Sequence, residues 1–317
     1  MEKVLIIKLG YSETLDKEIS EVSSLGDVLR TTVVLHKYKN ANVTWLVDRK
    51  AFPLLIHNRF IKRVLPYDMT TVLQLQREKF DTIINFEKVP GICALADSIN
   101  AWRRYGFRFD EIKGEAAAYD NSQEILGISR NEIFKKKNIK SLQQVIIELI
   151  GEKWNAQEYM LGYTPDTKVK YDVGFNWNVG VKWPTKEWPK ENWSKLESLI
   201  ANKYSVSWQQ GLKNIEEYVE WINSCKILIT SDSLGLHVAL ALKKKVIALF
   251  GPTVPAEIFF YNRGVVLTPK IKYDCIPCIS SICSQKIHCM NFIQPETVAK
   301  EIKNLMLSFN KLGKRKK

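Results

Sequence analysis

Residues 230–253 have the sequence TSDSLGLHVALALKKKVIALFGPT. This stretch begins at the end of an apolar run, passes through a polar turn and an apolar helical segment, and enters a second apolar run, KVIALFG. The order strand, polar turn, helix, strand predicts a parallel βαβ unit. Open α/β sheets bind ligands just beyond the carboxyl ends of their strands. The polar turn is therefore expected to lie at a ligand site.

Four residues of this turn are candidate ligand-binding residues: Asp232, Ser233, Gly235 and His237. Free amides at the start of a helix, together with the positive end of its dipole, favour a phosphate. Asp232 has two interpretations, because an aspartate there either caps the helix or binds ribose or sugar hydroxyls. His237, one turn into the helix, either donates to a phosphate or packs in the core.

The same alternation of strands and helices recurs in both halves of the chain. Strands are predicted at KVLIIK, NVTWLVD and FDTIINFE in the first half and at YDVGFNWN, YSVSWQQG, KILITSD and KVIALFG in the second. The segment LGDVLRTTVVLHKYK has the apolar period of a helix, whereas residues 107–143 are polar and are expected to form loops and helices without a strand. A turn-rich segment divides the chain into domains 1–165 and 166–317. The predicted fold is α/β, with two Rossmann-like domains and a ligand cleft between them.

A second motif, PTKEWP, follows the first strand of the second half. Pro184 and Pro189 stiffen this loop, so Lys186 is held in place between them. A fixed lysine close to a helix amino end is suited to bind a diphosphate leaving group. Lys182, four residues earlier, is a second candidate cation for the same group.

A third motif, SSLGDVLRTT, lies in the first half. Gly26 permits a tight turn, and Asp27 begins a helix. Asp27 is either a helix cap or a general base toward a hydroxyl. Arg30, Arg59 and Arg63 are candidate cations for an acceptor, with solvated surface arginines as the alternative.

Four of the six cysteines lie in one short segment, DCIPCISSICSQKIHCM. Such clusters in cytosolic chains are more often metal sites than disulfides. Cys275, Cys278, Cys283 and Cys289 are therefore candidate ligands of a structural zinc or iron ion. His288 is an alternative ligand, and small buried hydrophobes are the alternative role for the thiols.

Composition narrows the class of partner. Lys plus Arg number 47 against 34 Asp plus Glu, and the net charge of +13 favours anionic partners. A nucleic-acid binder is not favoured, because a recognition-helix motif is lacking and the basic residues are dispersed.

No run reaches the roughly 18 apolar residues of a spanning helix, and MEKVLIIKLG is unlike a signal peptide, so a cytoplasmic protein is expected. The basic end, FNKLGKRKK, either contacts anionic lipid at the inner membrane or is solvated.

Taken in order, these motifs resemble glycosyltransferase family 9, the bacterial lipopolysaccharide heptosyltransferases. The resemblance rests on VLIIKLG with SLGDVLRTT, on VTWLVD, FDTIINFE and PTKEWP, on residues 230–253 and on DCIPC. It implies a GT-B fold, with the acceptor on the amino-terminal domain and the nucleotide sugar on the carboxyl-terminal domain. It implies ADP-L-glycero-D-manno-heptose as donor, a lipopolysaccharide core-type acceptor, inversion at the anomeric carbon and no catalytic metal. By position, it makes Asp27 the catalytic base, Lys186 the phosphate-binding lysine, and Asp232, Ser233 and His237 the donor-binding segment.

Two features depart from the family pattern. The segment YSETLDKEISEVSS separates Gly10 from Leu25, where most members continue almost directly, and it is placed to cover the acceptor. The usual Asp-Thr-Gly of the donor motif is replaced by Asp232-Ser233-Leu234-Gly235. The alternative is a glycosyltransferase of the same fold that uses another nucleotide sugar or a protein or other glycan acceptor.

Overall fold

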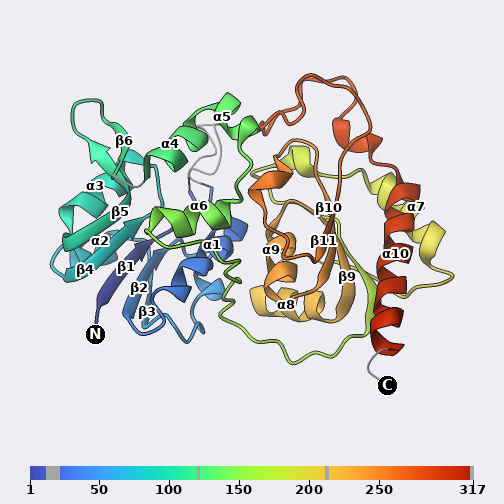
Figure 1. Ribbon diagram of the computed structural model, residues 1–317, viewed down its shortest axis with the longest axis horizontal. Coiled ribbons are helices and arrows are strands. Elements are labelled where there is room, and N and C mark those ends of the chain that lie inside the picture. Colours follow the sequence, from blue (N-terminus) through green and yellow to red (C-terminus); the bar gives the residue numbers. More distant parts are fainter. Residues whose placement is uncertain (12–21, 120–121, 211–213, 315–317) are drawn as a thin grey trace. The chain divides into compact units, whose positions relative to one another are not determined.

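The structure, a computed structural model, describes residues 1–11, 22–119, 122–210 and 214–314, with the backbone alone from 310 onward (Figure 1). The chain divides into two compact units, Met1–Thr164 with Ala256–Phe259 and Pro165–Pro255 with Phe260–Lys317. Each unit contains a parallel sheet with helices, so the predicted α/β class with two Rossmann-like domains is confirmed. Most of the inserted segment, residues 12–21, and the last three residues of the basic end lie outside the described residues.

The first unit is built on a six-stranded sheet of order β3-β2-β1-β4-β5-β6. Its strands are β1 (Lys3–Ile7), β2 (Asn42–Val47), β3 (Arg63–Pro66), β4 (Lys79–Asn85), β5 (Asn100–Asp110) and β6 (Glu115–Ala118). All neighbouring pairs are parallel except β5 and β6. Residues 4–7 of β1 are fully buried, as is typical of a central parallel strand covered on both faces.

The predicted first helix is shorter than its apolar period suggests. Helix α1 (Leu25–Thr31) tightens into the 3-10 turn η1 (Thr32–His36). The side chain of Thr31 donates to the carbonyl of Asp27 at 2.8 Å, and that of Thr32 donates to the carbonyl of Leu29 at 2.6 Å. Such bonds compete with regular helix geometry, as does the following run of β-branched residues.

The other helices of this unit are α2 (Met69–Leu75), α3 (Pro90–Ser98), α4 (Gln123–Arg130), α5 (Glu132–Lys137) and α6 (Leu142–Leu149), with the 3-10 turn η2 (Phe52–Leu54). The prediction that residues 107–143 lack a strand is wrong. Strand β5 continues to Asp110 and forms an antiparallel hairpin with β6. Phe107, Ala116 and Ala118 point into a small apolar cluster beneath α3 and α4, so the period-2 alternation was present but hidden among charged residues.

The second unit has a five-stranded, all-parallel sheet of order β11-β10-β9-β7-β8. Its strands are β7 (Tyr171–Asn176), β8 (Val206–Trp208), β9 (Cys225–Ser231), β10 (Lys245–Leu249) and β11 (Gly264–Leu267). The chain passes from β7 to β8 on one side and then to β9 on the other. The point between β7 and β9 is therefore a topological switch point, where open sheets bind ligands.

The helices of the second unit are α7 (Lys190–Ile200), α8 (Ile215–Asn223), α9 (Leu234–Ala241) and α10 (Pro295–Lys314), with 3-10 turns η4 (Pro184–Lys186) and η6 (Cys289–Phe292). The turn η5 (Pro255–Glu257) begins in the second unit and continues into the Ala256–Phe259 segment of the first. Trp188 and Trp193 are fully buried, and their ring centres lie 4.9 Å apart.

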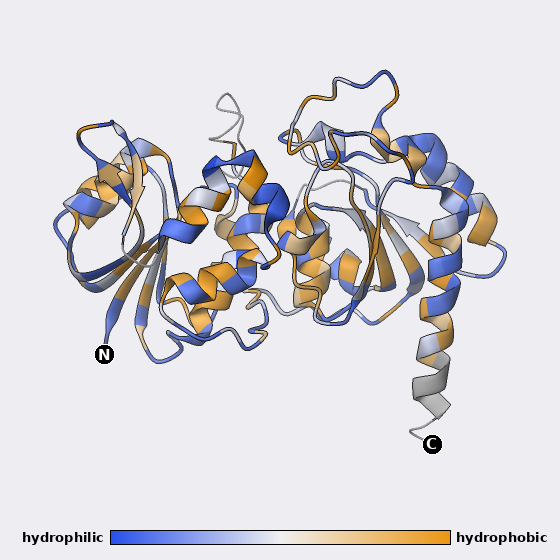
Figure 2. Ribbon diagram, turned by 45° about the horizontal axis from the view of Figure 1, so that its top comes forward, coloured by the Kyte–Doolittle hydropathy of each residue, from blue (hydrophilic) through white to orange (hydrophobic). Residues whose placement is uncertain are grey.

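The strands of both sheets are largely hydrophobic, whereas the helices carry polar residues between their apolar ones (Figure 2). Within the described ranges, no helix combines the length and apolar character needed to cross a bilayer.

Candidate active site

The candidate site of the second unit lies at the carboxyl end of β9. Strand β9 ends at Ser231, Asp232 follows, and Ser233 is the N-cap of α9. Thr230 of β9 pairs in register with Asn176, the last residue of β7. The polar turn singled out in the sequence therefore lies at the switch point of the sheet.

Lys186 and Asp232 meet at this point. The Nζ of Lys186 lies 2.7 Å from Oδ2 of Asp232, and the two side chains are 13% and 15% exposed. Lys186 ends the short turn η4, and its Nζ also lies 4.8 Å from the ring centre of Trp183. The loop therefore holds the ammonium group of Lys186 beside the start of α9. This agrees with the fixed position expected for Lys186 between Pro184 and Pro189.

Asp232 is ionised at neutral pH. Burial alone would raise the pKa of its carboxyl group, but the charge of Lys186 and a smaller contribution from His237 hold the pKa below its usual range. His237 is itself buried in the second turn of α9. The structure thus brings Lys186, Asp232 and His237 together. Lys182, also buried, lies in the turn that precedes η4.

The amino end of α9 has no side-chain cap. Ser233 occupies the N-cap position, but its hydroxyl forms no cap hydrogen bond. Instead, its Oγ accepts a bond from Nδ2 of Asn176 at 3.0 Å and lies 3.2 Å from the hydroxyl of Thr230. A helix amino end without a side-chain cap is the kind of place at which proteins bind anions.

Asn176 is a site residue that the sequence analysis missed. Its side chain is buried, donates to Oγ1 of Thr230 at 2.7 Å, and accepts from the hydroxyl of Tyr218 at 2.7 Å. A Cβ on Gly235 would lie 2.4 Å from Nδ2 of Asn176 and 2.7 Å from the Tyr218 hydroxyl. Glycine is therefore required at this position by close packing against Asn176. A polar residue ending an otherwise apolar strand was the available signal.

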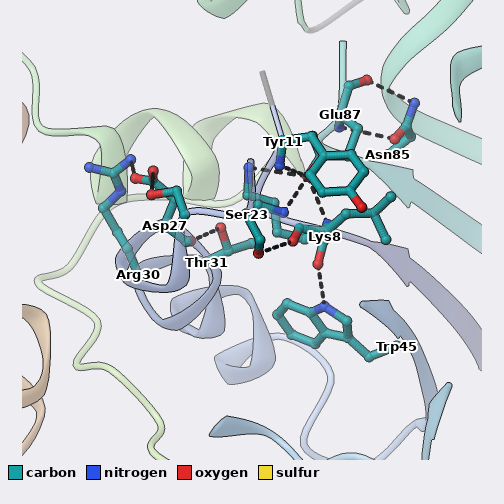
Figure 3. A network of polar contacts seen from close by, with 12 residues as sticks. Lys8, Tyr11, Ser23, Asp27, Arg30, Thr31, Trp45, Asn85 and Glu87 are labelled. Atoms are coloured by element: carbon teal, nitrogen blue, oxygen red, sulfur yellow. Dashed lines mark hydrogen bonds and ion pairs between the residues drawn. The ribbon is translucent and has the colours of Figure 1, made fainter. Parts of the chain in front are cut away.

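In the first unit, Asp27 lies in the first turn of α1, and Ser24 is the N-cap. The hydroxyl of Ser24 donates to one carboxylate oxygen of Asp27. The Arg30 guanidinium pairs with the other carboxylate oxygen (Figure 3). The side chains of Asp27 and Arg30 are 13% and 8% exposed. Asp27 is therefore held from both sides and is not the cap residue, while Arg30 is the ion-pair partner of Asp27.

The turn after β1 binds a carboxylate of the chain itself. Oε1 of the buried Glu87 accepts the backbone N–H groups of Leu9, Gly10 and Tyr11 at 2.7, 2.8 and 3.3 Å, and Nζ of Lys8 lies 3.4 Å away (Figure 3). Consecutive amides that converge in this way form an anion-binding nest. Because Glu87 fills the nest, this turn does not offer these amides to a phosphate.

The two ends of the inserted segment are joined. The N–H of Ser24 donates to the carbonyl of Gly10 at 2.8 Å, and the hydroxyl of Ser23 donates to the carbonyl of Leu9 at 2.9 Å. Gly10 has a φ of +93°, a conformation that favours glycine. The strand-to-helix turn that carries Asp27 is therefore closed although 13 residues separate Gly10 from Ser24.

The other predicted acceptor cations are not brought to Asp27. Arg63 begins β3, at the opposite edge of the sheet from the end of β1, and its guanidinium contacts Glu78 at 2.5 and 3.1 Å. Glu78 directly precedes β4, at that same amino edge. The guanidinium of Arg59 lies 4.7 Å from the ring centre of the adjacent Phe60.

The four cysteines predicted as metal ligands lie within the described residues. All four thiols are free, with Cys283 exposed and Cys289 buried. Among the residues that the structure describes, no three His, Cys, Asp or Glu side chains converge as metal ligands. Sγ of Cys289 lies close to Gly251, 2.9 Å from where a Cβ would stand, and burial raises the pKa of this thiol to about 11. The spacing suggested four ligands, but it could not show that Cys289 faces the core.

Sequence comparison finds relatives of the part of the chain that carries this turn. Residues 210–288, which include the turn at Asp232, match the sequence model of Glycosyltransferase family 9 (heptosyltransferase). The lipooligosaccharide heptosyltransferase 2 of Campylobacter jejuni (strain 81116) is 30% identical over 121 residues. Over this part of its length, the chain is similar to glycosyltransferase family 9. The aligned part spans 35% of this chain and 38% of the curated relative.

Comparison with solved structures shows the fold of the chain. E. coli ADP-heptose lps heptosyltransferase II superposes with a TM-score of 0.66 at 16% identity, covering 97% of this chain and 99% of that one. E. coli heptosyltransferase WaaC with ADP-2-deoxy-2-fluoro heptose gives a TM-score of 0.61 at 16% identity over 95% and 99%. These likenesses confirm the predicted GT-B class, with two Rossmann-like domains.

Proposed function

We propose that the chain is an inverting glycosyltransferase that transfers heptose from ADP-L-glycero-D-manno-heptose to a lipopolysaccharide core-type sugar. The observation that carries this proposal is the Lys186 ammonium held at the uncapped start of α9. Two comparisons support the choice of sugar and nucleotide. The curated relative is named a lipooligosaccharide heptosyltransferase, and WaaC was solved with an ADP-heptose analogue.

In this proposal the donor binds to the second unit. The diphosphate lies at the amino end of α9, where amides from Ser233 to His237 and the ammonium groups of Lys186 and Lys182 offset its charge. Charges arranged in advance around a leaving group stabilise the transition state by several kcal/mol. The turn after β1 supports placing the donor on the second unit. The backbone amides of that turn, which is the equivalent turn of the first unit, are already bound to the Glu87 carboxylate.

The acceptor binds to the first unit, and Asp27 is its general base. Asp27 takes the proton of the acceptor hydroxyl while that oxygen forms a bond to the anomeric carbon. The bond between this carbon and the diphosphate oxygen breaks, and ADP leaves with the electron pair. Attack from the face opposite the leaving group inverts the anomeric configuration. The net charge of +13 suits an anionic glycolipid acceptor, so we place the reaction at the cytoplasmic face of the inner membrane.

Calorimetric titration of the full chain with ADP, UDP and GDP tests the donor site. We expect ADP to bind most tightly, and Lys186→Met to weaken ADP binding about 10- to 100-fold, the usual worth of a hydrogen bond to a charged group. Lys190→Met is the matched control, because Lys190 is exposed and lies in the same region of the chain. Preference for UDP or GDP would keep the fold and replace the heptosyltransferase assignment by another nucleotide-sugar transferase.

A further inference from the structure

Asp232 places a carboxylate at the proposed diphosphate site. It lies one residue before the N-cap of α9, and its carboxylate is 2.7 Å from the ammonium group of Lys186. Lys186 is the cation that the proposed function gives to the diphosphate. A carboxylate in this place competes with the phosphate for that cation.

The competition is electrostatic and persists at physiological pH. Both side chains are largely buried, so their charges are only weakly screened by solvent. Lys186 and His237 keep Asp232 ionised. Any phosphate that approaches Lys186 therefore also approaches a fixed negative charge.

The charge of the ligand changes during the proposed reaction. In the sugar nucleotide, the phosphate nearest the sugar has one ester and one anhydride linkage and carries one negative charge. After the bond to the anomeric carbon breaks, the same phosphate is a terminal phosphate held only by the anhydride linkage, and it carries roughly −1.5 to −2 near neutral pH. The product thus places more negative charge beside Asp232 than the substrate does.

We propose that Asp232 makes the site favour the sugar nucleotide over the free nucleoside diphosphate and so promotes release of the product. This inference rests on the proposed function. Asp232 repels the terminal phosphate of the product more than the sugar-linked phosphate of the donor, and it re-forms its ion pair with Lys186 as the nucleotide leaves. Asp232 is accordingly a specificity-determining residue that distinguishes donor from product.

The test compares ADP and ADP-heptose as ligands of the wild-type chain and of Asp232→Asn. We expect Asp232→Asn to tighten ADP binding about tenfold or more, the worth of one close like-charge pair, and to change ADP-heptose affinity less than that. We also expect a burst of product in the first turnover of this variant, followed by slower steady-state turnover. Asp232→Ser removes the same charge and checks the sign if the asparagine variant is poorly folded.

Asp172→Asn is the matched control. Asp172 also has a depressed pKa and a lysine partner, Lys226, at 2.6 Å, but it lies at the amino end of β7, away from the switch point. This variant should bind ADP as the wild type does. If Lys186→Met weakens ADP binding but Asp232→Asn leaves it unchanged or weaker, the inference is wrong and the donor site stands. If Lys186→Met has no effect on ADP binding, the donor site itself is wrong.

Discussion

Replacing Gly235 with alanine tests why glycine is required at the start of α9. The two possible reasons are close packing against Asn176 and the wider backbone conformations open to glycine. The new Cβ would stand 2.4 Å from Nδ2 of Asn176, about 1 Å closer than the 3.4 Å at which ordinary contact begins. Asn176 cannot turn aside easily, because Thr230, Ser233 and Tyr218 hold its amide by hydrogen bonds. Either Asn176 or the amino end of α9 must therefore move by about 1 Å.

The expected cost follows from three contributions. Overpacking of this kind costs about 1–3 kcal/mol. Loss of one hydrogen bond of Asn176 adds about 1 kcal/mol, and the better helix propensity of alanine returns about 1 kcal/mol. We therefore expect Gly235→Ala to lower the free energy of unfolding of the second unit by about 2 kcal/mol. For a unit of this size that corresponds to a fall in Tm of roughly 4–8 °C.

Differential scanning calorimetry of the full chain measures this change, and calorimetric titration measures ADP binding by the same variant. ADP should bind more weakly, because the displaced helix carries the phosphate-binding amides. Gly180→Ala is the control, since a Cβ at Gly180 would meet nothing within 4 Å. It should change stability by less than about 0.5 kcal/mol. An unchanged or higher Tm for Gly235→Ala would refute the packing explanation.

Three further predictions concern individual charged groups. Asp27→Asn should lower kcat about 100- to 10,000-fold in the transfer assay and leave ADP affinity unchanged; near-wild-type turnover would exclude Asp27 as the base. Arg30→Gln should lower kcat without raising KM for the acceptor, because Arg30 holds Asp27 in place. Arg30→Lys should recover part of the lost kcat. A raised KM with unchanged kcat would instead make Arg30 an acceptor-binding residue. The folded pKa of Asp232 lies below its unfolded value near 3.9, so its ion pair stabilises the fold above about pH 4 and stops doing so as the pH falls through the folded pKa. The difference in Tm between wild type and Asp232→Asn should therefore be largest at neutral pH and shrink toward pH 3, and a constant difference would contradict this.

The elements that sequence analysis predicted correctly are those whose signal is local. The strands ending at Ile7, Asn85 and Ser231 were evident because central parallel strands are continuous apolar runs. The hairpin of β5 and β6 was missed because its apolar residues alternate with charged ones and one face is solvated.

The contacts that were missed join distant parts of the chain. Glu87 accepts the N–H of Leu9 across 78 residues, and Asn176 meets Ser233 across 57. Nothing near either residue in the sequence indicates its partner. The roles of Arg30 and of the cysteine segment were uncertain for a related reason, because spacing does not fix the direction of a side chain.

The central claim is tested most directly by following both products of one reaction. The full chain would be incubated with ADP-L-glycero-D-manno-heptose and a defined lipopolysaccharide core acceptor, and ADP and heptosylated acceptor would be measured in parallel, with the anomeric configuration determined by NMR. We expect equal amounts of ADP and heptosylated acceptor, with the configuration inverted. ADP release without a glycosylated product, or transfer only from a UDP- or GDP-sugar, would contradict the proposed heptosyltransferase activity.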